Sequence, residues 1–173
     1  MSRVVTNLLL YQLAWFACVM GAAAQRPVWG YAAVAAAIGW HLWRAPRPGR
    51  EALLVLAATA VGAVFEAVLV QLGWVRMAPE LLTAGVLPLW MVALWAAFAT
   101  TFNVSLRSLR DRPGLVALLS LAGAPLAYAA GARLGAFAWQ DAIAGLGIIA
   151  TGWAVMLPML LGVARRFDGY AAS

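Results

Sequence analysis

Long apolar runs alternate with short polar segments along this chain of 173 residues. A helix that crosses about 30 Å of hydrocarbon needs about 20 apolar residues. The runs therefore predict an all-α membrane protein, a bundle of six transmembrane helices with short loops. The predicted helices lie at about 4–24, 28–43, 51–72, 81–102, 113–133 and 139–163, so that residues 1–173 form a single integral membrane domain.

Proline, glycine and arginine mark the predicted connections. The clearest loop is 44–50, which holds two prolines, one glycine and three arginines. Pro88 predicts a kink inside the fourth helix, and Pro113 suits the first turn of the fifth helix. Many transporters repeat three helices twice, but helices one to three show no convincing match to helices four to six.

Composition supports lipid as the solvent. Hydrophobic residues make up 65% of the chain and charged residues 10%, whereas a soluble domain has about 45–50% and about 25%. The basic residues are twelve arginines, scattered singly, which argues against nucleic acid as a partner. Abundant Ala, Gly and Arg without Lys suggest a bacterial source. Cys18 is the single cysteine, so no disulfide is expected, and we expect no metal and no cofactor.

The arginines predict an orientation. Nine of them fall at the N-terminus, in loops 44–50 and 103–112 and at the C-terminus, and three fall in the other connections. Short loops rich in arginine stay on the cytoplasmic side of a membrane. We therefore expect both termini in the cytoplasm and a multi-pass protein of the bacterial inner membrane.

Glu66 is the most informative residue, because it lies deep within predicted helix 51–72. A carboxylate at such depth costs about 3 kcal/mol on insertion scales, so it should face the bundle interior or water. Helical spacing puts Thr59, Gly62, Glu66 and Gly73 on one small, polar face. Two interpretations stay open. Glu66 is a proton relay or an acid that binds a cation or headgroup, or it is a protonated or hydrogen-bonded structural glutamate.

Other polar residues are candidates for binding. Arg133 and Asp141 flank the connection between helices five and six and could pair with each other or with Glu66, although an interfacial pair facing water is favoured. His41 lacks a second His or Cys at metal spacing, so a satisfied interfacial histidine is favoured over a metal ligand. We expect His41 and Glu66 near opposite faces of the membrane.

Helices one and four carry a second set of candidates. Their polar residues should bridge helices by hydrogen bonds or line a pocket open to the cytoplasm: Asn7, Gln12, Asn103 and Ser105. Trp90 and Trp95 lie mid-helix near Pro88, where they form an aromatic pocket or simply pack. Small residues repeat every four positions along helix five, from Gly123 to Gly135, and helix six has a similar face. These stripes predict close packing of helices five and six, or a homodimer.

Several segments together resemble a bacterial family of small multi-pass membrane proteins, domain of unknown function 2878. They are Asn7 with Tyr11-Gln12, Gly73-Trp74-Val75-Arg76, Pro88-Leu89-Trp90-Met91 with Trp95, Asn103-Val104-Ser105-Leu106, and Gly123-Ala124-Pro125-Leu126-Ala127-Tyr128 followed by Gly131-Ala132-Arg133-Leu134-Gly135. The resemblance adds Tyr128 to the candidate residues. It implies no activity, but it hints at lipid modification, because genes of the family are thought often to neighbour those of cyclopropane-fatty-acid-synthase-like enzymes.

Three functions remain open. The sequence holds no Gly-x-Ser-x-Gly elbow, no P-loop and no paired histidines, so a non-catalytic role in lipid or envelope homeostasis is favoured over an enzyme. Its partners would be membrane lipids and a lipid-modifying enzyme. The second hypothesis is a small-solute or proton-coupled transporter that uses Glu66. The third is a membrane enzyme that acts on lipid.

Overall fold

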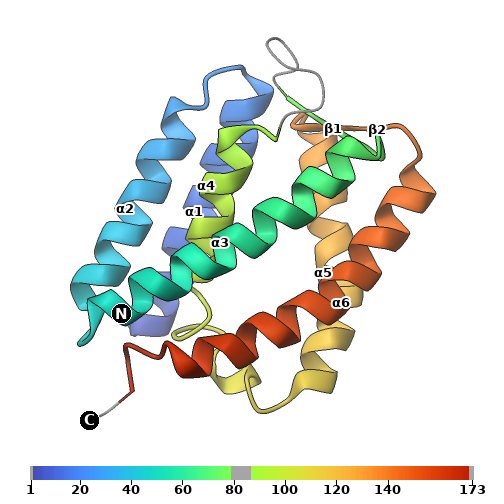
Figure 1. Ribbon diagram of the computed structural model, residues 1–173. Helices are drawn as coiled ribbons and strands as arrows, with labels where there is room; N and C mark the ends of the chain where they lie inside the picture. Colours follow the sequence, from blue (N-terminus) through green and yellow to red (C-terminus); the bar gives the residue numbers. More distant parts are fainter. Residues whose placement is uncertain (1, 79–86, 172–173) are drawn as a thin grey trace.

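The computed structural model describes all residues except 1, 79–86 and 172–173. The described residues form six α-helices, one short 3-10 helix and two three-residue strands (Figure 1). In chain order they are α1 (Arg3–Ala23), α2 (Val28–Arg44), α3 (Pro48–Gln71), β1 (Val75–Met77), α4 (Leu89–Ala99), η1 (Arg107–Leu109), α5 (Pro113–Arg133), β2 (Phe137–Trp139) and α6 (Ala142–Arg166). The predicted helical architecture is confirmed, with the two strands as an addition.

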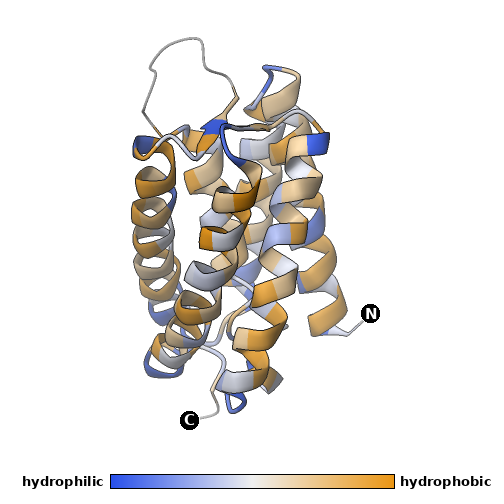
Figure 2. Cartoon of the chain, turned by 90° about the vertical axis from the view of Figure 1, so that its right-hand side faces the viewer, coloured by the Kyte–Doolittle hydropathy of each residue, from blue (hydrophilic) through white to orange (hydrophobic). Residues whose placement is uncertain are grey.

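Four of these helices, α1, α3, α5 and α6, are long and apolar enough to cross a membrane. Large apolar side chains on their outer faces are exposed, such as Leu118 at 63% and Ile143 at 88%. Hydrophilic residues gather mainly at the two ends of the bundle (Figure 2). Exposed apolar belts between polar ends are typical of a membrane protein. The helix α2 has 17 residues and α4 has 11, about 25 Å and about 16 Å at 1.5 Å per residue.

The predicted fourth helix, 81–102, is wrong in its bounds, because within the described residues α4 begins at Leu89 and ends at Ala99. Its first residues, 81–86, lie outside the described residues. Pro88 precedes the helix instead of kinking it, because proline has no N–H for an interior helical bond. At the other end, the Thr100 and Thr101 hydroxyls donate to the carbonyls of Ala97 and Phe98 at 2.7 Å. The same two carbonyls also accept the backbone N–H groups of Thr100 and Thr101 at 3.2 and 2.9 Å, so α4 ends in i→i+3 bonds that the hydroxyls supplement.

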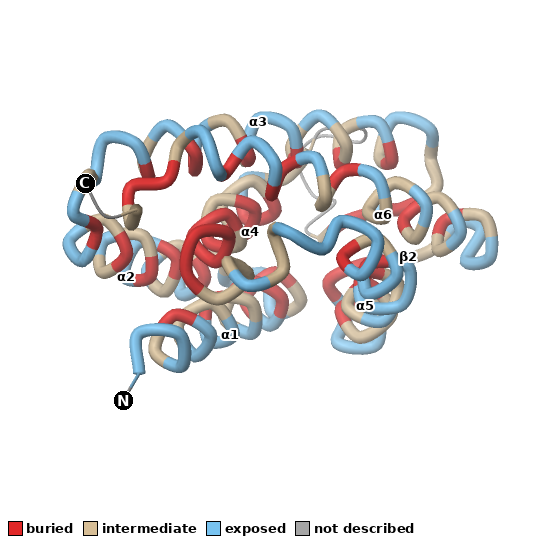
Figure 3. Tube along the Cα trace, turned by 90° about the horizontal axis from the view of Figure 1, so that it is seen from below, coloured by how far each residue is buried: buried red, intermediate tan, exposed pale blue. Residues whose placement is uncertain are grey.

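The short helix α4 lies inside the bundle, packed against α1, α2 and α3 (Figure 3). The irregular backbone that follows it is also enclosed, since residues 100–104 are buried or nearly so. Non-helical backbone at membrane depth is tolerated where protein surrounds it. The hairpins α1–α2 and α5–α6 are the two most extensive helix contacts. In the first, a Cβ at Gly30 would come within 2.8 Å of the Cys18 Cα, so glycine permits this close approach.

One pattern of sequence and structure occurs twice in the chain, once in α3–β1 and once in α5–β2. Both α3 and α5 begin in the sequence Arg-Pro-Gly, followed two residues later by Ala-Leu-Leu, at Arg47–Leu54 and Arg112–Leu119. Both end at a glycine with positive φ, Gly73 at 73° and Gly135 at 90°, and a strand starts two residues later. The strands pair antiparallel, Val75 with Trp139 and Met77 with Phe137. The shared pattern therefore covers α3–β1 and α5–β2, and it does not follow a three-plus-three division of the helices.

The small residues of the predicted stripes pack mostly against aromatic rings, whereas close helix–helix packing was expected of them. The helices α5 and α6 do pack together, but the glycines mainly accommodate aromatic rings. A Cβ at Gly131 would lie 2.3 Å from the Phe137 ring, and one at Gly152 would lie 2.5 Å from the Phe65 ring of α3. At Gly123 a Cβ would meet nothing within 4 Å. The predicted homodimer stays a prediction.

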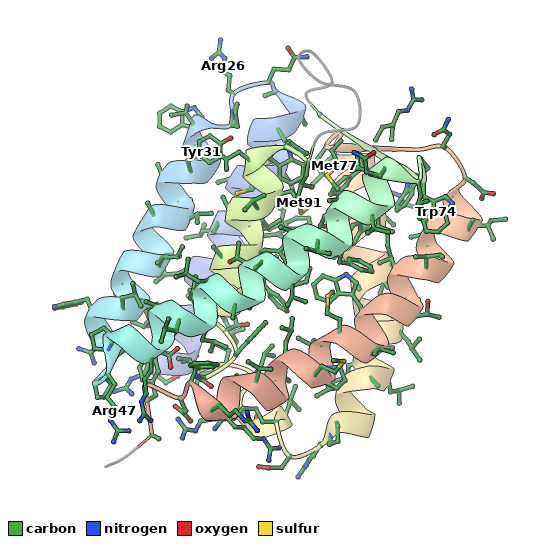
Figure 4. The ribbon with its side chains drawn as sticks, viewed as in Figure 1. Arg26, Tyr31, Arg47, Trp74, Met77 and Met91 are labelled. Carbon is green, nitrogen blue, oxygen red and sulfur yellow. The ribbon has the colours of Figure 1, made fainter. Side chains whose placement is uncertain are left out.

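Four segments meet at one end of the bundle: the N-terminus, the α2–α3 loop, the segment between α4 and α5, and the C-terminal tail. The Ser105 Oγ lies 3.4 Å from the Val4 carbonyl oxygen, and the Arg47 N–H donates to the Gly169 carbonyl at 3.1 Å. We call this the terminal end. Arg47 lies there and Arg26 lies at the opposite end (Figure 4). The nine arginines that the sequence grouped together are therefore on one end of the molecule.

Candidate functional site

Glu66 of α3 is fully buried and holds two aromatic residues together. The Trp95 Nε1–H of α4 donates to Glu66 Oε1 at 3.1 Å, and the Tyr128 hydroxyl of α5 donates to the same oxygen. The other carboxyl oxygen, Oε2, has no hydrogen-bond partner among the described residues. The sequence predicted that this face of α3 packs inward, which is confirmed, and the structure adds Trp95 and Tyr128 as the partners.

The repeat explains why Glu66 and Tyr128 meet. Each stands seven residues before the positive-φ glycine that ends its helix, so the β1–β2 pair brings them to the same height. Trp95 of α4 also stacks on Trp153 of α6, with ring centroids 4.8 Å apart. Gly62 completes the group, since a Cβ there would lie 2.0 Å from the Trp95 ring.

A cavity of about 260 Å³ lies beside this group. Its wall includes Glu66, residues of α1, α4, α5 and α6, and Phe137 of β2. The wall is almost entirely apolar, and seven of its twenty residues are aromatic: Tyr11, Trp15, Trp95, Phe98, Tyr128, Phe137 and Trp153. On one side it is formed by Trp15 of α1 and by Leu119 and Gly123 of α5, and the last two are exposed. The trace of α1 and that of α5 lie on the same side of α4 (Figure 3), and the exposed Leu119 and Gly123 bring the cavity wall to the outer surface of α5.

Charge is distributed unevenly over the cavity wall. Glu66 is the one acidic residue among the described residues that line the cavity, and none of these residues is arginine, lysine or histidine. Besides the Glu66 carboxyl group, the polar side chains in the described wall are those of two tyrosines, three tryptophans and one serine: Tyr11, Tyr128, Trp15, Trp95, Trp153 and Ser120. The Ser120 hydroxyl donates to the Val116 carbonyl of its own helix at 2.8 Å. The wall therefore offers a ligand one acidic group within an apolar, aromatic surface.

A second polar group lies at the terminal end, about 22 Å along α3 from Glu66 at 1.5 Å per residue. His41 Nε2 lies 2.8 Å from Glu51 Oε2, and both side chains are fully buried. Glu51 Oε1 accepts from the Asn103 amide at 2.8 Å and from the Gly169 N–H at 2.6 Å. The sequence predicted a satisfied histidine, and the structure gives its partner. His41 and Glu66 lie near opposite ends of the bundle, as expected.

The C-terminal tail closes over this pair. Asp168 accepts from Arg110 at 3.0 Å and pairs with Arg107 at 3.0 Å, and Arg110 also donates to the side-chain amide oxygen Oδ1 of Asn103 at 2.7 Å. The Tyr170 hydroxyl donates to the His41 carbonyl at 2.6 Å. Burial, and then the nearby Glu51 charge, raise the pKa of Tyr170 to about 12, so the hydroxyl keeps its proton at neutral pH. Both buried acids at this end, Glu51 and Asp168, have hydrogen-bond or ion-pair partners, which fits a structural role in holding the tail in place.

The helix-bridging prediction is confirmed for Asn7 and Ser105. The Asn7 amide donates to the Thr100 carbonyl at 3.2 Å, and the Ser105 hydroxyl donates to Asn7 Oδ1 at 2.5 Å. These bonds tie α1 to the irregular segment after α4. Asn103 belongs to the group around Glu51, and Gln12 is exposed on α1.

The remaining candidates lie away from the cavity. Asp141 caps α6 by accepting from the backbone N–H groups of Ile143 and Ala144 at 3.0 Å. Arg133 is exposed at the end of α5, and neither residue joins Glu66. Trp90 is in the first turn of α4 and not mid-helix, and its Nε1–H donates to the Ala78 carbonyl at 2.6 Å. Of the two predicted pocket tryptophans, Trp95 alone lines the cavity.

Sequence reasoning missed Trp153, Glu51, Arg110 and Asp168. A signal existed for Glu51, because it faces His41 across the proline-rich loop that joins two antiparallel helices. Asp168 and Arg110 are 58 residues apart, and nothing in the local pattern links them.

The chain matches the family model described as "Protein of unknown function (DUF2878)" over residues 4–159, and it belongs to that family. The resemblance read from the sequence is confirmed. No curated protein and no solved structure matches the chain.

Proposed function

We propose that this member of the DUF2878 family is a multi-pass protein of the bacterial inner membrane that binds an amphipathic small molecule beside Glu66. One observation carries the proposal: a buried carboxyl group with an unpartnered oxygen stands in the wall of an otherwise apolar cavity. Binding sites for small molecules are typically apolar hollows with a few polar groups that fix the ligand's orientation.

Size and position support a ligand. A cavity of about 150 Å³ is large enough for benzene, and this one measures about 260 Å³. It lies where α3–β1 and α5–β2 face each other, and transporters built from repeats bind substrate at such an interface. Two residues of its wall, Leu119 and Gly123, are exposed on α5, which suits a ligand that enters from the bilayer. A carrier for an amphipathic solute is therefore the leading candidate.

A non-catalytic role in lipid or envelope homeostasis is the second candidate, and the exposed wall residues Leu119 and Gly123 favour it. A lipid tail is already in the bilayer and could enter the cavity without crossing water. Catalysis has less support, because the buried histidine that could act as a base is engaged with Glu51 near the other end of α3.

The proposal includes six membrane passes with both termini in the cytoplasm. Although α4 is short, the chain returns through α4 and residues 100–106 to the terminal end, where Ser105 contacts Val4. Each helix therefore runs from one end of the bundle toward the other.

Photo-crosslinking tests the binding proposal. Two probes would share one alkyl chain with a diazirine, and they would end in a hydroxyl or in a trimethylammonium group. We expect at least one to label cavity residues on α3, α5 or α6 of the protein in liposomes. Gly123→Trp should abolish this labelling by filling the cavity. Gly147→Trp is the matched control, because a Cβ at either glycine meets open space and Gly147 does not line the cavity. Labelling that is confined to lipid-facing residues and equal in both variants would overturn the proposal.

A further inference from the structure

The geometry points to a hydrophobic cation as the ligand, bound against Glu66 in exchange for a proton. The class meant is an amine or quaternary ammonium with apolar substituents. This inference rests on the proposed binding function and names its ligand class.

The first argument is charge balance. Two donors, from Trp95 and Tyr128, converge on one oxygen of Glu66, which is an arrangement that stabilises a carboxylate. A buried carboxylate without a counter-charge is costly. No basic residue is found among the described residues of the cavity wall. The missing positive charge must come from outside the wall, as a ligand or as a proton on Glu66 itself.

The second argument is the aromatic lining. Cations bind over aromatic faces within about 6 Å, and quaternary ammonium groups are recognised by aromatic cages. Phe98 joins the Trp95–Trp153 stack, with its centroid 5.4 Å from that of Trp153. Tyr128, which also contacts the carboxyl group, stacks on Phe137 with ring centroids 5.4 Å apart. The rings also suit the apolar substituents, while a small hydrated ion would find almost no polar ligands here.

The two occupants of the carboxyl group exclude each other. When no ligand is bound, a proton on Glu66 removes the unpaired charge. When the cation binds, the O–H bond breaks, the proton passes to the aqueous phase, and the carboxylate pairs with the cation. The other titratable groups in the wall are Tyr11 of α1 and Tyr128 of α5, and α4 and α6 contribute none to the described lining. Such an exchange is the elementary step of a proton-coupled carrier.

Binding of a matched probe pair tests the inference. Dodecyltrimethylammonium and 1-dodecanol have the same chain and differ in charge. Calorimetric titration would use the full chain in lipid nanodiscs, with Gly123→Trp as the blank for partitioning into lipid. We expect the cation to bind about tenfold more tightly than the alcohol, which corresponds to about 1.4 kcal/mol. Lowering the pH from about 8 to about 5 should weaken binding of the cation alone, because protons then compete for the carboxylate.

Glu66→Gln gives the decisive comparison. Its amide oxygen can still accept from Trp95 and Tyr128, so the fold should persist, and a melting curve checks this. We expect the Kd of the cation to rise about tenfold or more, with the Kd of dodecanol changed less than about twofold. Equal binding of the two probes, unaffected by Glu66→Gln, would overturn the cation inference and leave the proposed cavity function standing. If Gly123→Trp altered binding of neither probe, the proposed function itself would fall.

Discussion

Gly62 determines whether Trp95 can reach Glu66. The two residues Gly62 and Glu66 are one helical turn apart on α3, and the Trp95 ring lies over the glycine in the space that a side chain would need. A larger residue would push the indole away from the carboxyl group. The site therefore depends on the absence of a Cβ methyl group at position 62 as much as on its polar atoms.

We expect Gly62→Ala to destabilise the protein by about 1–3 kcal/mol, because a Cβ at 2.0 Å from the Trp95 ring overpacks the core. The matched control is Gly39→Ala on α2. A Cβ there meets nothing within 4 Å, so this change should stabilise the helix by about 0.5–1 kcal/mol. Thermal unfolding in detergent measures both. Equal effects of the two substitutions would contradict the packing argument.

Hydrophobic pattern predicted the elements whose ends carry strong local signals. The predicted helix 113–133 matches α5, since Pro113 begins it and the αL residue Gly135 follows it closely. The pattern failed for α4, because the run 81–102 is apolar throughout while the helix is bounded by Pro88 and by two threonine hydroxyls. Glu66 was identified because a buried acid stands out in an apolar helix. Its partners required the helix arrangement, which no local pattern contains.

Asp168 is the buried acid of the C-terminal tail itself, and it pairs with two arginines. We expect Asp168→Asn to cost about 2–3 kcal/mol, because Arg107 and Arg110 lose a charged partner. Asp111→Asn is the matched control. Asp111 pairs with Arg165 but its side chain is 82% exposed, so the loss should stay within about 0.5 kcal/mol. Limited proteolysis reports the tail directly, with faster cleavage after residue 166 in Asp168→Asn. Cleavage at the wild-type rate would show that the tail is held by other contacts.

The buried acidic residues lie in two separate regions of the bundle. At the terminal end, Glu51 and Asp168 are saturated with partners and join four chain segments into a closed network. Toward the other end, Glu66 keeps one oxygen unpartnered beside the cavity. A network with every partner in place rigidifies a structure, whereas an unsatisfied acid next to open space invites a ligand. The terminal end is therefore the anchor, and the repeat interface is the part suited to binding.

The arginine distribution sets the orientation of this arrangement. Nine arginines at the terminal end should keep that end in the cytoplasm. Single cysteines at exposed positions test this with a membrane-impermeant maleimide, and the wild type is the blank because Cys18 is buried. In intact cells we expect labelling of Gln25→Cys and Ala138→Cys, whereas Ser2→Cys and Arg50→Cys should react only after lysis. The reverse pattern would invert the orientation. A difference between Ser2→Cys and Arg50→Cys would contradict an even number of passes between them, and with it the proposal that α1 and α2 each cross the bilayer.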